Sequence, residues 1–296
     1  MITRGAMLAA VLVATPVQAQ SNWDEVPIRT EPLSGNVHII YGAGGNIAVS
    51  AGDDGVFIVD DQFAPLTERL KATIAGISGK PIRYVINTHF HYDHTGGNEK
   101  HGSMGSVIVA HDNVRQRLST GSFIEAFNHT EPPQTGPALP VVTFSEEMSL
   151  HLNGEEARII HIPNAHTDGD SIIHFRTSNV IHMGDIFFNG RFPFIDTSNG
   201  GTIGGVITAV ARALAAADEN TKVIPGHGKL TDKAGLQAYH DMLTEARARV
   251  KALRDADEIL EDIIASNPLA DMEGWVNPEN AGPTKLFIKT IFDTVD

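Results

Sequence analysis

Apolar and polar residues alternate over short stretches in the first half of the chain, which predicts β-strands separated by turns. The apolar runs 37–41 and 47–50 flank the glycine-rich segment 42–46 and predict a β-hairpin with a flexible tip. Residues 66–77 place apolar side chains at helical spacing, which predicts a helix. Further predicted elements of this half are strands at 55–60, 82–87 and 107–109 and a helix at 112–119. Residues 120–140 carry many Gly and Pro and no period, so a long surface loop is expected there.

The second half begins with strands again and ends with helices. Strands are predicted at 148–150, 157–162, 171–175, 180–183 and 223–224, and helices at 202–217, 232–265 and 283–295. Two successive series of this kind favour the α/β class, as two packed sheets with helices outside in a four-layer αββα sandwich. Ligands are then expected in loops at one edge, where the two halves meet. No segment has the composition of a linker, so residues 20–296 are expected to form a single domain.

Residues 1–19 have the layout of a cleaved secretory signal peptide. They combine a basic start, the apolar run 6–14 and small residues before the expected cleavage after Ala19. The apolar run is too short to span a bilayer, and no later segment reaches the roughly 20 apolar residues of a membrane span. The mature protein is therefore expected in the periplasm.

Composition narrows the chemistry further. The chain has no cysteine, so a metal site cannot use thiolate and no disulfide stabilises an exported form. Its formal net charge of −14 supplies no basic surface for phosphate backbones. This argues against a nucleic-acid partner and favours a small-molecule substrate.

Histidines and carboxylates gather directly after the apolar run 82–86. The segment His89-Phe90-His91-Tyr92-Asp93-His94 places three imidazoles and one carboxylate within six residues. These are the groups that Zn²⁺ accepts where no thiolate is available. The alternative is a polar loop that is rich in histidine by coincidence. Three more candidate ligands argue against it, each in a turn marked by Gly or Pro: His166, Asp185 and His227.

These ligand-type residues are too many for one tetrahedral zinc, which takes four ligands in all. Two ions about 3.5–4 Å apart, with a bridging carboxylate and a bridging water, would use all of them. We expect His89, His91 and His166 at the first zinc, Asp93, His94 and His227 at the second, and Asp185 between the two. Two cations lower the pKa of the bridging water, so that hydroxide exists at neutral pH. Asp93 is also expected to hold this water and to shuttle its proton.

The remaining histidines and nearby carboxylates have weaker support. Three histidines fall inside predicted strands and are expected to pack there or to support a ligand from behind: His161, His174 and His182. Six others are expected to be structural or solvated: His38, His101, His111, His129, His151 and His240. Asp60 ends an apolar strand and is a candidate acceptor for the second N–H of a ligating histidine. Asp168 and Asp170 beside His166 either do the same or only shape the turn.

The order of these motifs resembles that of the metallo-β-lactamase superfamily. The matching residues are Asp60, the segment His89-x-His91-x-Asp93-His94, then His166, Asp185 and His227. The resemblance covers about residues 35–230, nearly all of the expected mature chain. It implies an αββα sandwich and, most often, a metal-dependent hydrolase.

The resemblance does not select one subfamily. In the largest group of zinc β-lactamases a Cys stands at the position of Asp185, and another group has His at position 94 but no ligand at 185. Both ligands are present here, as in glyoxalase II, lactonases and RNase Z. The carboxylate-binding Lys of the first group corresponds to Phe188, where the Tyr of lactonases is missing too. Lys229 or Arg191 is left to bind a substrate carboxylate, the alternative for each being a surface charge.

Three features favour a β-lactamase: the export signal, the spacing of the last three motifs, and the tip 42–46, which resembles a substrate-covering loop. We therefore expect a metal-bound hydroxide to attack the amide carbonyl of a β-lactam and open the ring. The alternative is a lactone, ester or thioester hydrolase of the glyoxalase II type with the same metal centre. The acidic charge disfavours a nuclease, and His91 disfavours redox iron enzymes, which typically have Glu there. Metal used only for structure is disfavoured because structural zinc sites are closed four-ligand cages.

Overall fold

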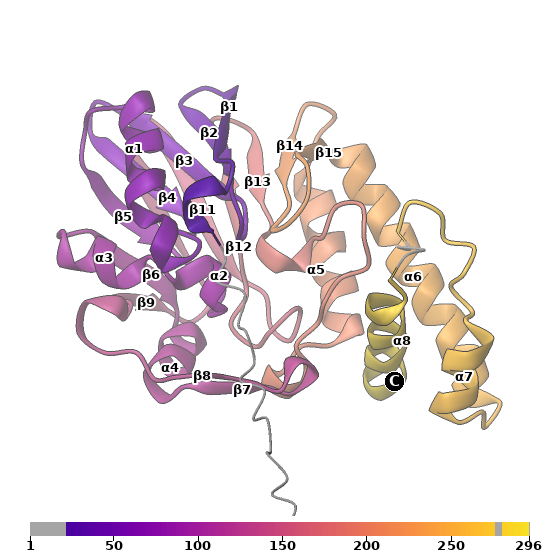
Figure 1. The fold of residues 1–296 in the computed structure, drawn as a ribbon. Coiled ribbons are helices and arrows are strands. Elements are labelled where there is room, and N and C mark those ends of the chain that lie inside the picture. The colour runs from indigo at the N-terminus through magenta and orange to yellow at the C-terminus, as the bar shows by residue number, and fades with distance from the viewer. Residues whose placement is uncertain (1–21, 276–279, 296) are drawn as a thin grey trace, which may run out of the picture.

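Two mixed β-sheets form the centre of the fold, which a computed structural model describes for residues 22–275 and 280–295 (Figure 1). The predicted signal peptide, residues 1–19, lies outside the described residues. The first sheet has the strand order β1-β2-β3-β4-β5-β6-β9. Its strands are β1 Arg29–Ser34, β2 Val37–Tyr41, β3 Ile47–Gly52, β4 Gly55–Val59, β5 Ile82–Ile86, β6 Val107–His111 and β9 Val142–Phe144. Strands β4, β5, β6 and β9 run parallel, so their carboxyl ends lie at one edge.

The second sheet has the order β10-β11-β12-β13-β14-β15. Its strands are β10 Glu147–Leu152, β11 Glu155–His161, β12 Ser171–Phe175, β13 Val180–His182, β14 Lys222–Ile224 and β15 Thr231–Asp232. Strands β10 to β13 pair antiparallel, and β13 pairs parallel with β14. The turns after β11, β13 and β14 therefore lie at one edge of this sheet.

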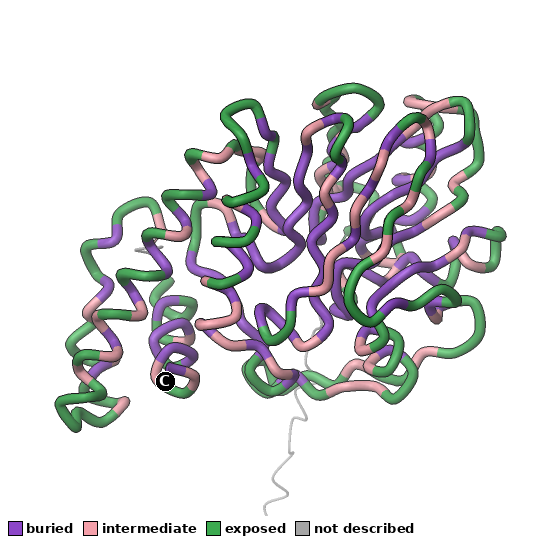
Figure 2. The backbone as a smooth tube through the Cα atoms, turned by 180° about the vertical axis from the view of Figure 1, so that it is seen from behind, coloured by how far each residue is buried: buried purple, intermediate pink, exposed green. Residues whose placement is uncertain are grey.

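Apolar side chains from both sheets fill the space between them. The Phe57 ring of β4 stacks on the Phe175 ring of β12, with ring centroids 5.7 Å apart, and both side chains are fully buried. Figure 2 shows the same pattern along the chain, with buried central strands and exposed connecting loops. This core fixes one sheet against the other, and with them the loops at their edges.

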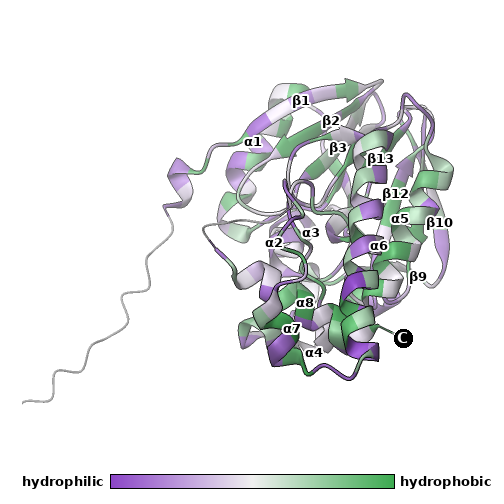
Figure 3. Cartoon of the chain, turned by 90° about the vertical axis from the view of Figure 1, so that its right-hand side faces the viewer, coloured by the Kyte–Doolittle hydropathy of each residue, from purple (hydrophilic) through white to green (hydrophobic). Residues whose placement is uncertain are grey.

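Helices lie outside the two sheets and in the loops between strands. They are α1 Thr67–Ile77, α2 Tyr92–Thr95, α3 Asn98–Ser103, α4 Asp112–Thr120, α5 Ile203–Ala216, α6 Lys233–Asp255, α7 Leu260–Ser266 and α8 Gly282–Thr294. Helix α1 packs on the first sheet, and α5, α6 and α8 pack on the second. Hydrophilic and hydrophobic residues alternate along α6 (Figure 3), as one buried face requires. The predicted αββα sandwich is confirmed, and within the described residues no helix has the length and apolar content to cross a membrane.

The structure corrects the long helix predicted at 232–265. Helix α6 ends at Asp255, and α7 starts again at Leu260. Between them Asp257 adopts a left-handed conformation with φ of 62°, which ends the helix without any Gly or Pro. The break turns α7, so that Ile263 packs into the same apolar cluster as α6 and α8. The apolar period continues across the break, so it could not reveal the turn.

The long loop predicted at 120–140 is also wrong in part, because it contains a small hairpin. Strand β7 Ser122–Ile124 pairs antiparallel with β8 His129–Glu131, and the 3₁₀ turn η3 Glu125–Phe127 joins them. We call the segment 122–131 the arm. Phe123 and Phe127 are 48% and 58% exposed and Ile124 is buried, so the arm has one buried apolar side chain in β7 and no apolar period.

Candidate metal centre

The end of β5 positions the first four candidate ligands. After Ile86 the backbone N–H of Asn87 still bonds to Val109 O of β6 at 2.9 Å, which keeps the start of the loop attached to the sheet. His89 and His91 follow in the loop, and the short helix α2 begins directly after His91. Asp93 and His94 lie on α2. The segment therefore has little freedom, as a catalytic metal site requires.

The other three candidate ligands come from the second sheet. His166 lies in the turn between β11 and β12, Asp185 in the 3₁₀ turn η5 Gly184–Ile186 after β13, and His227 directly after β14. The N–H of Gly226 donates to Gly184 O at 2.8 Å, which ties the turns of Asp185 and His227 together. Residues separated by more than a hundred positions thus meet at the shared edge of the two sheets.

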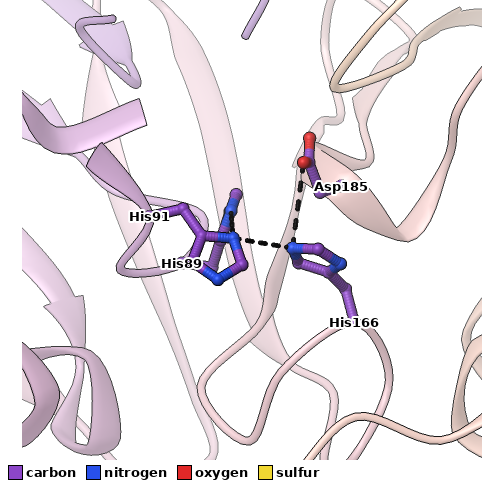
Figure 4. Close-up of side chains that lie close together, drawn as sticks. All are labelled: His89, His91, His166 and Asp185. Carbon is purple, nitrogen blue, oxygen red and sulfur yellow. Dashed lines mark hydrogen bonds and ion pairs between the residues drawn. The ribbon is translucent and has the colours of Figure 1, made fainter. Parts of the chain in front are cut away.

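The first ligand group consists of His89, His91, His166 and Asp185, all buried (Figure 4). His91 Nδ1 lies 3.1 Å from His89 Nε2 and 2.9 Å from His166 Nε2. Asp185 Oδ2 lies 3.8 Å from His166 Nε2. One ligand atom from each residue lies within 4.8 Å of the others, a spacing that suits one shared ion.

The second group consists of Asp93, His94 and His227. Asp93 Oδ2 lies 3.1 Å from His227 Nε2 and 3.6 Å from His94 Nε2. Asp185 reaches this group too, because its Oδ1 is 3.0 Å from His94 Nε2 and its Oδ2 is 3.4 Å from His227 Nε2. The structure thus brings together all seven residues singled out from the sequence, with Asp185 between the two groups.

Hydrogen bonds on the far side of the rings fix the tautomers of the first group. His91 Nε2 donates to Asp196 Oδ2 at 3.0 Å, and His166 Nδ1 donates to the backbone oxygen of Phe194 at 2.9 Å. The facing atoms, His91 Nδ1 and His166 Nε2, then carry lone pairs and no proton. Two lone pairs 2.9 Å apart repel each other unless a cation lies beside both.

Asp60 fixes the tautomers of His89 and His94 in a similar way. The Thr88 hydroxyl donates to Asp60 Oδ2 at 2.8 Å and so accepts the Nδ1 proton of His89 at 3.0 Å. His94 Nδ1 donates to Asp60 Oδ2 at 2.7 Å. The inward Nε2 of His89 therefore also carries a lone pair, whereas the inward Nε2 of His94 faces Asp185 Oδ1 at 3.0 Å. This donor set fits divalent cations such as Zn²⁺.

The two groups differ in their electrostatics. Burial lowers the pKa of His166 to about 4 and that of His89 well below its usual range, and neighbouring imidazoles add to both shifts. Burial opposes charge on His227 and His94 as well, but the nearby carboxylates, Asp185 foremost and Asp93 next, together outweigh it. They raise the pKa of His227 to about 9 and raise that of His94. His89 and His166 therefore offer neutral imidazoles, and the second group gathers carboxylates whose negative charge a cation would neutralise.

A trough of about 880 Å³ opens from the ligands to solvent. Its walls come from the arm, the segment 191–194 and the start of α8. Most of its large side chains are aromatic: Phe63, Tyr92, Phe127, Phe188, Phe192 and Phe194. Among the described lining residues Arg191 is the only Lys or Arg, and Lys229 is not part of the lining. The trough therefore offers apolar walls and one cation near the candidate metal centre.

The hairpin tip 42–46 does not cover this trough, so the prediction of a flexible covering loop is wrong. Gly45 N donates to Asp93 O at 3.0 Å, and the Gln62 side chain donates to Gly45 O at 2.7 Å. A Cβ on Gly45 would lie 2.0 Å from the His94 ring. The glycines of the tip serve close packing beneath the ligands, which composition alone could not separate from flexibility.

A family model described as the metallo-beta-lactamase superfamily matches residues 30–227. The chain belongs to this superfamily. Its members are metal-dependent hydrolases. Three similar proteins differ in their described activities, and each is only distantly similar to this metallo-β-lactamase-fold chain.

The 2,4-dinitroanisole O-demethylase subunit alpha of Nocardioides sp. (strain JS1661) is 26% identical over 56% of this chain. The match covers 48% of that relative's own length. The hydroxyacylglutathione hydrolase of Rhodospirillum rubrum is 27% identical over 72% of this chain and 79% of its own length. The solved metallo-beta-lactamase from Pontibacter korlensis aligns with a TM-score of 0.60 and 17% identity over 74% of this chain and 99% of its own. The structural likeness shows the fold alone.

Asp196, whose carboxylate accepts the hydrogen bond of His91 Nε2, could not be recognised from the sequence. Its oxygens also accept hydrogen bonds from Ser198 Oγ at 2.6 Å and from Asn199 Nδ2 at 2.7 Å. Asp196 follows no strand and belongs to none of the recognised motifs. Its only signal is the segment Asp-Thr-Ser-Asn-Gly, which is typical of a turn.

The other carboxylates and histidines have structural contacts. Asp168 pairs with Arg117 at 2.7 Å, and Asp170 accepts hydrogen bonds from the backbone and hydroxyl of Thr167, so both shape the turn. His182 is packed as expected, with its Nε2 bonded to Asn46 O at 2.9 Å.

His161 stacks on His111 with ring centroids 3.5 Å apart, in the seam between the sheets. His174 is half-buried within β12.

Proposed function

We propose that this chain is a dinuclear zinc hydrolase that opens β-lactam rings. The observation that carries the proposal is the set of inward-facing lone pairs and carboxylates at the base of an apolar trough. One cationic side chain, Arg191, lines this trough. His89, His91 and His166 would hold the first ion, Asp93, His94 and His227 the second, and Asp185 both. When bound, the two ions supply hydroxide at neutral pH and polarise the substrate carbonyl.

Asp93 is the best placed group to handle the proton of the attacking water. It lines the trough, and its side chain is 27% exposed, more than that of any other candidate ligand. Its carboxylate can accept a hydrogen bond from a water in the trough while it remains beside His227. Asp93 would thus orient the water and accept its proton.

Arg191 is the candidate for binding the carboxylate that β-lactams carry. Its guanidinium lies 5.1 Å from the centre of the Phe188 ring, and Phe188 stacks on His227 with centroids 5.2 Å apart. The cation is thereby held one aromatic ring away from a candidate ligand. A guanidinium binds a carboxylate through two parallel hydrogen bonds, which would orient the ring carbonyl.

A thioester hydrolase is the second candidate. It is favoured by the hydroxyacylglutathione hydrolase of Rhodospirillum rubrum, of which this chain covers 79%. The presence of both His94 and Asp185 also agrees with this group. The same residues would act on a thioester carbonyl, with a thiolate as the leaving group.

The test is turnover by purified protein reconstituted with zinc. Nitrocefin, S-lactoylglutathione and an aryl lactone are the substrates. We expect nitrocefin hydrolysis that chelation abolishes and zinc restores, and Arg191→Gln is expected to raise KM about tenfold. Lys229→Gln is the matched control, because Lys229 does not line the trough.

Hydrolysis of S-lactoylglutathione without hydrolysis of nitrocefin would replace the first candidate by the second. Absence of turnover on all three, with two zinc ions bound, would overturn the proposal of an acyl hydrolase.

A further inference from the structure

We infer that the arm forms a subsite for a large apolar group of an anionic substrate, with Phe127 and Phe194 as the side chains that set specificity. The role of the subsite in turnover rests on the proposed function, whereas its binding of a ligand does not. The substrate class is an acyl compound with one carboxylate and a bulky aryl or alkyl group. Its carboxylate would meet Arg191, and its apolar group would lie against the arm.

An unbroken aromatic wall connects the candidate ligands with the arm. The Phe194 ring lies 5.6 Å from the His166 ring and 6.0 Å from the His91 ring, measured between centroids. Phe127 at the tip of the arm lies 4.6 Å from Phe194. A group attached to a carbonyl above the histidines would therefore meet Phe194 first and Phe127 next.

The arm is fixed to the turn that supports a candidate ligand. The backbone oxygen of Phe123 accepts a hydrogen bond from Asn199 Nδ2 at 3.0 Å. Ser198 Oγ, whose proton goes to Asp196, accepts a hydrogen bond from Glu125 N at 3.2 Å. The same turn carries Asp196, which holds His91. A subsite built on this anchored hairpin loses little freedom when a ligand binds.

Exposure and charge define the occupant. Phe127 is 58% exposed and Tyr92 39%, so both rings leave apolar surface at the mouth of the trough that a ligand can cover. The volume of about 880 Å³ suits a molecule of the size of an acylated β-lactam. Because Arg191 is the only Lys or Arg among the described lining residues, one anionic group on the ligand matches it.

Binding is tested without turnover, using dansylglycine, which combines a fused aromatic ring system with one carboxylate. Fluorescence titration with zinc-loaded protein is expected to give about tenfold weaker binding for Phe127→Ala and for Arg191→Gln. Phe123→Ala is the matched control, because this second exposed phenylalanine of the arm does not line the trough. Equal affinity of Phe127→Ala and the parent protein would overturn the subsite, and so would an equal loss in Phe123→Ala.

Specificity is tested with two β-lactams that share ring and carboxylate, benzylpenicillin and 6-aminopenicillanic acid, which lacks the arylacyl group. The ratio of their kcat/KM values is expected to fall about tenfold in Phe127→Ala, and to stay unchanged in Phe123→Ala. An unchanged ratio in Phe127→Ala would overturn the role in specificity. If neither compound is hydrolysed, the proposed function fails, while the dansylglycine titration still decides whether the subsite exists. Thermal unfolding and zinc content of each variant confirm that it is folded and loaded.

Discussion

Replacing Asp196 by Asn is the most selective test of the candidate metal centre. All of the contacts recorded for its carboxylate are hydrogen-bond donors: His91 Nε2 at 3.0 Å and Asn199 Nδ2 at 2.7 Å on one oxygen, Ser198 Oγ at 2.6 Å and Asn199 N at 3.2 Å on the other. An amide has only one oxygen. In either orientation the NH₂ group of the new amide side chain would face two hydrogen-bond donors. Water cannot relieve this, because Asp196 is 1% exposed.

The expected size of the effect follows from the role of such carboxylates. Loss of a carboxylate behind a ligating histidine lowers metal affinity by about 10- to 100-fold, which corresponds to about 1.4–2.8 kcal/mol. Asp196 contacts His91 alone among the candidate ligands, so only the first ion should be weakened. Asp60 contacts His94 directly and His89 through Thr88, so Asp60→Asn should weaken both ions.

The assay is competition for zinc between the protein and a fluorescent chelator. Asp196→Asn is expected to show one weakened and one unchanged binding step, and Asp60→Asn two weakened steps. Thermal unfolding of the metal-free variants separates loss of ligands from loss of the fold. If Asp196→Asn is folded and binds both ions as tightly as the parent protein, the reasoning from the tautomers is refuted.

Three further predictions concern the scaffold. Burial lowers the pKa of His101 to about 4, from about 6.5 in an unfolded chain. The contribution of neutral His101 to the free energy of unfolding is therefore fully present above about pH 6.5 and is lost as the pH falls toward 4. Urea unfolding should show a stability loss between pH 7 and pH 5 that is smaller in His101→Gln by about 2 kcal/mol, and an equal loss would contradict the shift. Gly45→Ala should displace His94 and weaken zinc binding, because the new Cβ would lie 2.0 Å from its ring, whereas Gly76→Ala, with nothing within 4 Å, should bind zinc normally. Phe57→Ala, fully buried between the sheets, should lower the free energy of unfolding by about 3–5 kcal/mol in a denaturant titration, and a loss below 1 kcal/mol would refute its place in the core.

Much of the fold, and the convergence of the seven candidate ligands, could be predicted from the sequence. Apolar periodicity marks β3, β4, β5, β11 and β12 because these strands are buried on one or both faces. The candidate ligands stand out because they follow strands β5, β11, β13 and β14, at the edge of a sheet. The convergence of His89 and His227 rests on pairing between distant strands, and the motif order was needed to anticipate it.

The features that the sequence did not reveal depend on how turns and short strands are placed in space, which leaves no periodic pattern in the sequence. The support of His91 by Asp196 depends on a turn with no periodicity, and the strands of the arm are too short and too exposed to create an apolar period. The tip 42–46 shows the opposite error. Its glycines indicated mobility, but they permit close contact, since Gly45 lies against the ring of His94.

The turn formed by residues 196–199 links two functions that are separate in sequence. One side of it fixes the tautomer of His91 through Asp196, and the other side holds the arm through Asn199 and the backbone of Phe123. Because Asn199 Nδ2 donates both to Asp196 and to Phe123 O, a shift of the carboxylate changes the support of the arm. Order at the first metal group and order in the aromatic subsite therefore depend on the same hydrogen bonds. A substrate that presses on the arm would act on the orientation of His91 by the same route.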